Sequence, residues 1–329
     1  MKAPILKKIT EIKECHEKKW EDNYSWIHQK NILEVLKDSS KLDKDVRQYL
    51  EKENKFTEYH LKKTKPLQNK LFKEIKGRIK LNNISLPFKD LNYEYWTKTT
   101  KTGNYSIKIR RKLNSKKTET YWDGNKEHKL SKSKYFGIGD VTVSNNDKLL
   151  GYSIDLKGSE YYTIHIRRIF DKKFVSSKIQ ETSGSITFSL DDKYIFYSKL
   201  DDNHRPKKIF RHKIGAPVKN DVLIFEELNE RFTASIGMTS DEKYFIIGSG
   251  DHTTSEVYYF PTHENNPKPR LFKKAKEGII YSINSWNNDF YIHTNDEAED
   301  FKICKCKHNK INAWEDVVPA KDEVLVGGF

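Results

Sequence analysis

The chain has 329 residues, of which 36% are hydrophobic and 33% are charged, and its formal net charge at pH 7 is +14. Its 18 tyrosines, 17 phenylalanines and 6 tryptophans exclude a chain that is disordered throughout, because disordered chains are poor in aromatic residues. The sequence has no run of 18 apolar residues, which excludes an ordinary transmembrane helix.

The cysteines and the charge distribution narrow the class of protein further. Three cysteines, Cys15, Cys304 and Cys306, are too few and odd in number for a disulfide framework, so they favour a reducing, cytoplasmic compartment. The first 20 residues are charged throughout and lack the apolar core of a signal peptide. Basic residues run from Lys2 to Lys321 without a patch, which favours a solvated surface with no specific nucleic-acid or membrane partner. A missing acidic partner domain would also explain the excess charge.

Residues 1–78 are predicted to be helical. Apolar residues recur near helical spacing over residues 27–36 and 45–71, and Pro4, Pro66 and Gly77 are the only helix breakers. We assign residues 1–78 as an N-terminal helical segment and residues 79–329 as a separate β domain.

From about Leu91 the apolar period changes to two. Residues 105–110 and 162–167 alternate apolar and polar side chains, which is typical of half-buried antiparallel strands. Five segments repeat one layout, an apolar strand, a polar turn and an alternating strand: 93–96 with 105–110, 149–152 with 161–167, 194–197 with 207–212, 244–247 with 256–260, and 290–292 with 301–305.

Further strands complete these repeats. Preceding strands fit at 139–143, 185–189, 233–238 and 279–283, fourth strands fit at 174–179, 222–226 and 270–272, and polar turns recur at 144–148, 189–193 and 240–243. Four strands in about 45–50 residues is the signature of a β-propeller blade. A β-sandwich is the alternative, but its strands do not recur as matched four-strand units.

The last seven residues, 323–329, are predicted to be the first strand of a sixth blade. The fold class is therefore mainly β, an incomplete and open propeller of about five blades with an N-terminal helical segment. An open propeller leaves unpaired strand edges, so we expect a truncated gene product or half of a split enzyme, which forms oligomers or aggregates when isolated.

The sequence offers one local arrangement that imitates a serine hydrolase. Gly248-Ser249-Gly250-Asp251-His252 contains serine, aspartate and histidine, but a turn after a strand splays neighbouring side chains apart. A catalytic triad instead needs the base within hydrogen-bonding reach of the nucleophile. The G-x-S-x-G nucleophile elbow does not occur in the sequence.

Metal and phosphate motifs are equally weak. On a strand, Cys304, Cys306 and His308 would lie on one face about 6.6–6.8 Å apart, too far for one tetrahedral zinc ion. The pair Cys15-His16 lies in a predicted helical region, and neither G-x-x-x-x-G-K-[ST] nor G-x-G-x-x-G occurs. We expect no catalytic residue, no metal ligand, no cofactor-binding residue and no cofactor in this chain.

An ordered series of motifs resembles oligopeptidase B-like members of the prolyl oligopeptidase family. Residues 16–27 are similar to their H-G-x-x-R-x-D-x-Y-x-W-L opening, matching at His16, Asp22, Tyr24 and Trp26 and departing at Glu17 and Trp20. Similar motifs follow along the chain: Tyr49–Asn54 (Y-L-x-x-E-N), Glu74–Arg78 (E-I-x-x-R), Asp155–Glu160 (D-x-x-G-x-E), and Asp201–Pro206 with Arg211–Gly215 (D-x-x-x-R-P…R-H-x-L-G).

The resemblance implies a seven-bladed propeller that caps an α/β-hydrolase domain and admits only short peptides. The catalytic serine, aspartate and histidine and most substrate-recognition carboxylates would lie beyond this chain. We therefore expect the propeller part of a serine endopeptidase, inactive alone, with oligopeptide substrates and a missing or separately encoded peptidase domain as partners. Arg205 is expected to pair with a carboxylate of its own turn. The alternative is a non-catalytic basic propeller that binds a protein or nucleic-acid partner.

Overall fold

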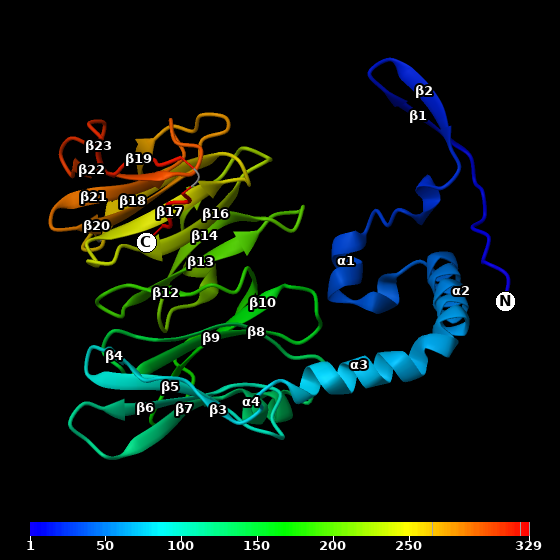
Figure 1. The fold of residues 1–329 in the computed structure, drawn as a ribbon, viewed down its shortest axis with the longest axis horizontal. Coiled ribbons are helices and arrows are strands. Elements are labelled where there is room, and N and C mark those ends of the chain that lie inside the picture. The colour runs from blue at the N-terminus through cyan, green and yellow to red at the C-terminus, as the bar shows by residue number, and fades with distance from the viewer. Residues whose placement is uncertain (265, 323, 329) are drawn as a thin grey trace.

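The computed structural model describes residues 1–264, 266–322 and 324–328. An N-terminal segment lies beside a stack of twisted antiparallel sheets, which confirms the mainly β fold class (Figure 1). The segment contains β1 (Glu11–Cys15), β2 (Lys18–Asp22), α1 (Ile32–Lys37), α2 (Lys44–Leu61) and α3 (Lys65–Gly77), with 3-10 turns at Ser25–Ile27, Ser39–Lys41 and Lys62–Thr64.

The helices begin and end where the local sequence directs them. The Asp43 carboxylate caps α2 by accepting hydrogen bonds from the backbone N–H groups of Asp45 and Val46, at 2.8 and 3.2 Å. Pro66 lies in the first turn of α3, where a missing N–H costs nothing. The helical prediction for residues 1–78 is thus confirmed for α1, α2 and α3.

The helical prediction is wrong at β1 and β2, which form a hairpin with Cys15 paired to Lys18. His16 and Glu17 form the turn with φ values of 48° and 63°. A two-residue turn with both φ values positive matches the twist of a hairpin and usually contains glycine. Glu17 replaces the glycine of the H-G-x-x-R-x-D-x-Y-x-W-L motif. The sequence therefore lacks the glycine that usually indicates a hairpin turn.

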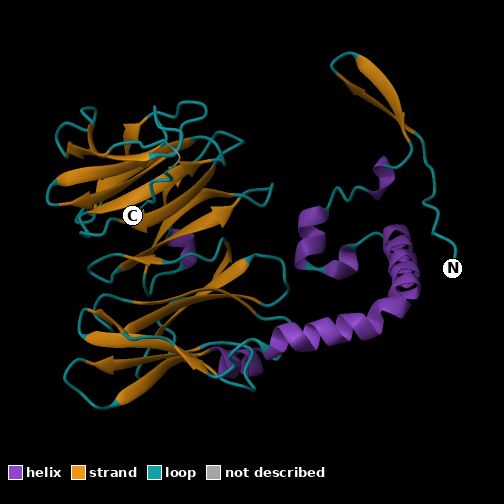
Figure 2. Cartoon of the chain, in the orientation of Figure 1, coloured by secondary structure: helices purple, strands orange, loops and turns teal. Residues whose placement is uncertain are grey.

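The propeller blades follow in chain order, with each strand pairing mainly with its sequence neighbours (Figure 2). Blade 1 contains β3 (Asn83–Ile84), β4 (Phe88–Asp90), β5 (Tyr93–Thr99), β6 (Ile107–Lys112) and β7 (Thr118–Asp123). Helix α4 (Gly124–Ser131) leads to blade 2. Blade 2 contains β8 (Gly137–Val143), β9 (Leu149–Asp155), β10 (Tyr162–Arg168) and β11 (Ile179–Thr182). Blade 3 contains β12 (Thr187–Phe188), β13 (Tyr194–Leu200), β14 (Pro206–Lys213) and β15 (Val222–Glu226), with a 3-10 turn at Val218–Asn220. Blade 4 contains β16 (Thr233–Met238), β17 (Tyr244–Gly250), β18 (Ser255–Pro261) and β19 (Arg270–Lys273), and blade 5 contains β20 (Tyr281–Trp286), β21 (Asp289–Thr294), β22 (Lys302–Lys307) and β23 (Glu315–Val318).

The fourth strand of blade 2 differs from the prediction at residues 174–179. Phe174 makes only an isolated bridge to Arg167, and the strand proper is β11, which also pairs with β13 through Thr182 and joins blades 2 and 3 into one sheet. The Ser176 hydroxyl accepts a hydrogen bond from Gly215 N at 2.7 Å. This contact with blade 3 draws the chain away from β10 between the bridge and β11.

The predicted strand at residues 323–329 is not found in the described part of that range. Glu323 and Phe329 lie outside the described residues, and residues 324–328 form no strand. Val326 instead adds to blade 5, where its N–H donates to Asp300 O at 2.9 Å and its carbonyl oxygen lies 2.8 Å from His293 Nε2.

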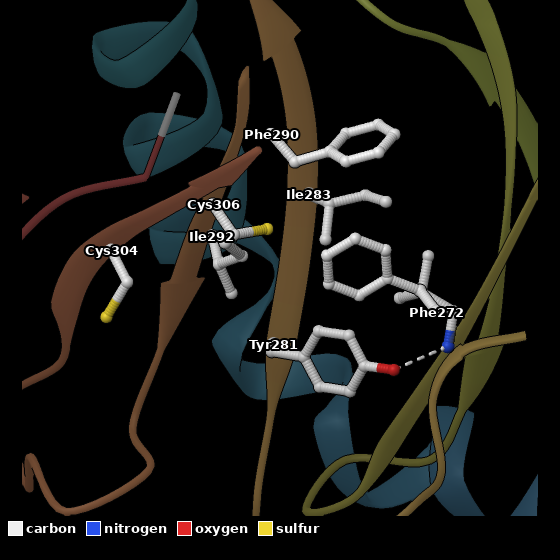
Figure 3. Packing of buried hydrophobic residues seen from close by; sticks show 8 residues of the cluster. Phe272, Tyr281, Ile283, Phe290, Ile292, Cys304 and Cys306 are labelled. Atoms are coloured by element: carbon white, nitrogen blue, oxygen red, sulfur yellow. Dashed lines mark hydrogen bonds between the residues drawn. The ribbon is translucent and has the colours of Figure 1, made fainter. Parts of the chain in front are cut away.

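The hydrophobic core consists of clusters that each join two consecutive blades. Figure 3 shows the last of these, where Phe272 of blade 4 packs against Tyr281, Ile283 and Phe290 of blade 5. The Tyr281 hydroxyl also accepts a hydrogen bond from Val257 N at 3.0 Å. Because each cluster couples only nearest neighbours, the stability of this domain is approximately a sum over blades and blade interfaces.

The recurring polar turns are confirmed and share one geometry. Ser144, Ser189 and Thr239 each accept, through the side-chain hydroxyl, a hydrogen bond from the N–H five residues on, at 3.0–3.1 Å. A residue with left-handed φ lies three positions after each hydroxyl. The third turn therefore begins at Thr239, one residue before the predicted range 240–243.

These turns also link neighbouring blades. The Asp192 carboxylate accepts hydrogen bonds from Asn145 N, Asn145 Nδ2 and Asn146 N, at 2.8, 3.2 and 2.7 Å. We expect Asp192→Asn to lower the free energy of unfolding in urea by about 1–3 kcal/mol, because one carboxylate oxygen that accepts backbone N–H bonds is replaced by an amide donor. Asparagine tolerates the left-handed conformation of this position.

The matched control for this prediction is Asp202→Asn, which changes an exposed aspartate with no hydrogen bond among the described residues. Its free energy of unfolding should match that of the unsubstituted chain within about 0.5 kcal/mol. Equal losses in the two variants would mean that the Asp192 link contributes nothing specific.

Candidate functional site

The serine, aspartate and histidine of residues 248–252 do not form a catalytic arrangement. At the end of β17, Ser249 Oγ donates to the Glu227 carboxylate and not to His252. Asp251 accepts from Thr253 N at 2.9 Å and from Arg231. These bonds, first that of Thr253 N, lower the pKa of the Asp251 carboxyl to about 2. The three side chains therefore belong to separate contacts, as expected of a turn.

The side chains of Cys304, Cys306 and His308 in blade 5 do not gather around one point either. Cys304 and Cys306 are buried on β22, and Figure 3 shows their sulfur atoms pointing in different directions. Burial raises the pKa of both thiols to about 11. Within residues 1–264, 266–322 and 324–328, no three histidine, cysteine or acidic side chains gather as metal ligands. Cys15 and His16, for which the sequence pattern predicted a helix, lie instead at the tip of the β1–β2 hairpin.

Two serine–histidine–aspartate arrangements form from residues that are distant in the sequence. In the first, Asp221 Oδ1 lies 2.7 Å from His212 Nδ1, and His212 Nε2 lies 3.2 Å from Ser176 Oγ. In the second, Ser285 Oγ lies 2.8 Å from Asp241 Oδ2 and 3.0 Å from His308 Nε2. Sequence reasoning missed both, because their members come from different strands and turns.

Only the first arrangement has the order of a catalytic triad, in which the acid orients the base and the base contacts the serine. His212 is completely buried, and the Asp221 side chain is 4% exposed. Ser176 Oγ already accepts from Gly215 N, and Tyr197 OH donates to the second Asp221 oxygen at 2.9 Å. A base with no exposed surface cannot pass a proton to a substrate, so the geometry supports a structural link between blades 2 and 3.

Among the described residues Arg205 has no carboxylate partner for its guanidinium, contrary to expectation. Its backbone N–H donates to Asp201 within the turn, at 2.9 Å, whereas its guanidinium donates to the backbone oxygen of Glu230 at 2.6 Å. The carboxylate of the turn is occupied by backbone donors, which leaves the guanidinium to reach the loop that follows β15. The residue therefore ties one turn of blade 3 to its exit loop.

The N-terminal segment is held against blade 2 through the end of α1. Lys37 forms an ion pair with Glu181 and lies 4.7 Å above the Tyr161 ring. Lys157 Nζ donates to the Lys37 carbonyl oxygen at 2.6 Å. The Glu181 hydrogen bond raises the pKa of the Lys37 ammonium group above its usual value.

Helix α3 has an apolar face that the described residues leave exposed. Every residue of the helix is exposed, including Leu67, Leu71, Phe72 and Ile75, of which Phe72 keeps 64% of its surface. At about 100° per residue these side chains share one side of the helix, and Lys65, Lys70, Lys73 and Lys76 occupy the other. Amphipathic helices of this kind bury their apolar face against another element.

The excess positive charge is less diffuse than its spread from Lys2 to Lys321 suggested. Residues 62–80 contain eight lysine or arginine residues and one glutamate, and so supply +7 of the net charge of +14. Helix α3 therefore has both an exposed apolar face and a basic face. Every residue of this helix is exposed.

The family is shown by the match of the whole chain to a family model. The model described as "Prolyl oligopeptidase, N-terminal beta-propeller domain" matches residues 4–329. The chain belongs to the prolyl oligopeptidase family. Protease 2 of Moraxella lacunata is 26% identical, with 100% of this chain and 49% of that protein aligned. Dipeptidyl aminopeptidase BI of Pseudoxanthomonas mexicana is 25% identical, with 99% and 46% aligned.

Solved structures of the prolyl oligopeptidase family share the fold. Oligopeptidase B from Leishmania major superposes with a TM-score of 0.88 at 22% identity, over 99% of this chain and 47% of that one. The chain therefore spans about half the length of the relatives it matches and corresponds to their N-terminal propeller part. No helix among its described residues is long and apolar enough to cross a membrane.

Proposed function

We propose that this chain acts as the propeller part of an oligopeptidase B-like serine endopeptidase. In this role residues 79–329 limit access to the active site to short peptides, and residues 1–78 form the unit that holds a peptidase domain. The observation that carries the proposal is α3, an amphipathic helix without a partner in a chain that spans about half of its relatives. The catalytic serine, histidine and aspartate would belong to the peptidase domain. The free cysteines support a reducing, cytoplasmic location.

The first test is the size of the polypeptide in its source cells, measured by immunoblot against this segment. A band far heavier than the 38.9 kDa of this chain that reacts with a fluorophosphonate probe would support one continuous peptidase. A band at 38.9 kDa that copurifies with a separate probe-reactive protein would support a split enzyme. Probe labelling of the 38.9 kDa chain itself, or its cleavage of Arg- or Lys-containing peptides, would overturn the proposal.

The docking role of α3 makes a prediction for the isolated chain. We expect the purified chain to form oligomers through α3, and Leu71→Glu to shift it toward the 38.9 kDa monomer in light scattering. The control is Asn69→Glu, which adds the same charge about 160° around the helix, on the polar side. A monomeric unsubstituted chain, or equal effects of the two variants, would contradict docking through the apolar face.

The charge on residues 62–80 favours one competing function, the binding of a polyanion by the basic face of α3. Binding of duplex DNA with a steep dependence on salt would support it, because each neutralised phosphate releases counterions. The Asn69→Glu and Leu71→Glu variants separate the two functions. DNA binding responds to the added charge on either side, whereas docking of a peptidase domain responds mainly to the loss of Leu71.

A further inference from the structure

A pocket of about 610 Å³ lies where the N-terminal segment meets blade 2. Its walls come from Lys37 at the end of α1, from α4, and from β9, β10 and β11 with their loops. The volume is within the range of about 300–1,000 Å³ that is usual for small-molecule sites. One wall is the loop that carries the Asp155–Glu160 motif, whereas neither serine–histidine–aspartate arrangement lines this pocket.

The acidic side chains of the pocket are already satisfied within the protein. The Asp155 carboxylate accepts four hydrogen bonds from its own turn. Glu127 accepts from Arg167 Nη2 at 2.8 Å, and Glu181 pairs with Lys37. Glu127 and Glu181 are therefore each paired with a cation of the chain, and Asp155 is held by the donors of its own turn.

Two lysines of the pocket form no ion pair with a carboxylate of the described residues, although Asp38 lies close enough to Lys157 for the two charges to interact. Lys157 Nζ donates to a backbone carbonyl oxygen, that of Lys37, and no carboxylate of the described residues pairs with it. Lys178 is exposed and has neither a hydrogen bond nor an ion pair with any described residue. Its charge is close enough to lower the pKa of the His165 imidazole, after the larger effect of burial. Both ammonium groups are therefore available to an anionic ligand.

His165 is a buried polar residue of the pocket, as are Asp155 and Ser159, and 7% of its surface is exposed. Its ring stacks on Tyr152 with centroids 4.9 Å apart, and neither ring nitrogen is hydrogen-bonded to a described residue. Nδ1 is fully buried. In a neutral imidazole one nitrogen donates and the other accepts. Placing the proton on Nε2 avoids burying an unpaired N–H group, and turns a donor toward the pocket.

Two further buried hydrogen-bond donors near His165 lack an acceptor among the described residues. Trp122 Nε1 and Arg167 Nε are buried without a hydrogen-bond partner in the described part of the chain. The Arg167 guanidinium lies 5.8 Å from the Trp122 ring centroid and 5.0 Å from that of Tyr152. Unpaired buried donors are costly, and a negatively charged acceptor in the adjacent pocket would offset part of that cost electrostatically.

We propose that this pocket binds the oxyanion of a small molecule, a carboxylate or a phosphate group, with Lys157, Lys178 and His165 as its donors. The inference does not depend on a docked peptidase domain, because every group it uses belongs to the described part of this chain.

The test is calorimetric titration of the full chain with three probes: sodium phosphate, N-acetyl-alanyl-alanine with a free carboxylate, and the same dipeptide as its C-terminal amide. We expect saturable binding of phosphate or of the free acid, and at least about tenfold weaker binding of the amide, since bonds to charged groups are the stronger ones. Preference between the first two probes identifies the source of the oxyanion. Equal affinity for acid and amide without phosphate binding, or no saturable binding at all, would overturn the proposal.

Variants connect the binding to the named residues. Lys178→Gln changes an exposed side chain and should preserve the fold while weakening the binding of the oxyanion about tenfold or more. His165→Phe keeps the stacking on Tyr152 but removes the donor, and should weaken binding similarly. Lys219→Gln, an exposed lysine outside the pocket, is the matched control and should leave affinity unchanged. Unchanged affinity in Lys178→Gln would place the anion elsewhere.

Discussion

Asp221→Ala is expected to lower the free energy of unfolding by about 2–5 kcal/mol, because two buried donors lose their common acceptor. His212 Nδ1 and Tyr197 OH lie 2.7 and 2.9 Å from the two oxygens of this carboxylate. His212 has no exposed surface, so bulk water does not reach this donor in the folded chain. The measurement is urea denaturation at pH 7, with fluorescence and circular dichroism compared to check for a two-state transition.

Asp221→Asn is the informative partner variant, because it keeps one carbonyl acceptor and the shape of the side chain. Its loss of stability should lie between those of Asp221→Ala and the exposed control Asp202→Ala. If Asp221→Ala were as stable as the control, the buried group would be energetically neutral and the structural interpretation of this arrangement would be wrong.

Asp221→Ala also tests whether Asp221, His212 and Ser176 act as a catalytic triad. A working triad loses labelling by a fluorophosphonate probe when its acid is removed. A purely structural link instead predicts no labelling of Ser176 before or after the substitution. The arrangement shows that hydrogen-bond order alone does not make a nucleophile, since an accessible base is also needed.

Much of the propeller could be predicted because its determinants are local. Period-two alternation, as in residues 105–110 and 162–167, repeats with the same polar turns, and each turn is closed by a hydroxyl five residues from its N–H partner. Propeller blades pair their strands in chain order, so reading local strands in sequence reproduces the sheets.

The errors arise where distant contacts or unusual turns override the local pattern. Ser176 binds blade 3 and displaces the fourth strand of blade 2 from residues 174–179 to β11. The β1–β2 hairpin turns through His16 and Glu17 without glycine, so no turn signal separated residues 11–22 from the helical periodicity that begins at residue 27. Neither the displaced strand nor the hairpin could be predicted from the residues of its own short segment.

The apolar face of α3 and the pocket at blade 2 differ in how far the sequence could have revealed them. The charge count over residues 62–80 and the spacing of Leu67, Leu71 and Ile75 are visible without a structure. The pocket is not, because Lys37 of the N-terminal segment and Lys178 and His165 of blade 2 line it together only in the folded chain. Only the fold shows which acids are already paired and which donors are free.

His165 predicts a specific loss of stability in acid. Burial, with the charges of Lys178 and Arg167, lowers the pKa of its imidazole to about 4, whereas an unfolded histidine has a pKa of about 6.5. Between these values the unfolded chain binds more protons, so stability falls as the pH falls through this window. At about 1.4 kcal/mol per pKa unit, the full effect is about 3 kcal/mol. Above pH 7 the imidazole is neutral in both states and contributes no such dependence.

The comparison of the unsubstituted chain with His165→Phe isolates this contribution. Carboxylates destabilise both proteins as they protonate, so the quantity to follow is the difference in their free energies of unfolding between pH 7 and pH 4.5. We expect the variant to gain about 2–3 kcal/mol relative to the unsubstituted chain over this interval. A difference independent of pH would mean that the imidazole keeps its usual pKa. That result would mean that the protonated imidazole is as well stabilised in the folded chain as in water, contrary to its burial without a hydrogen-bond partner among the described residues.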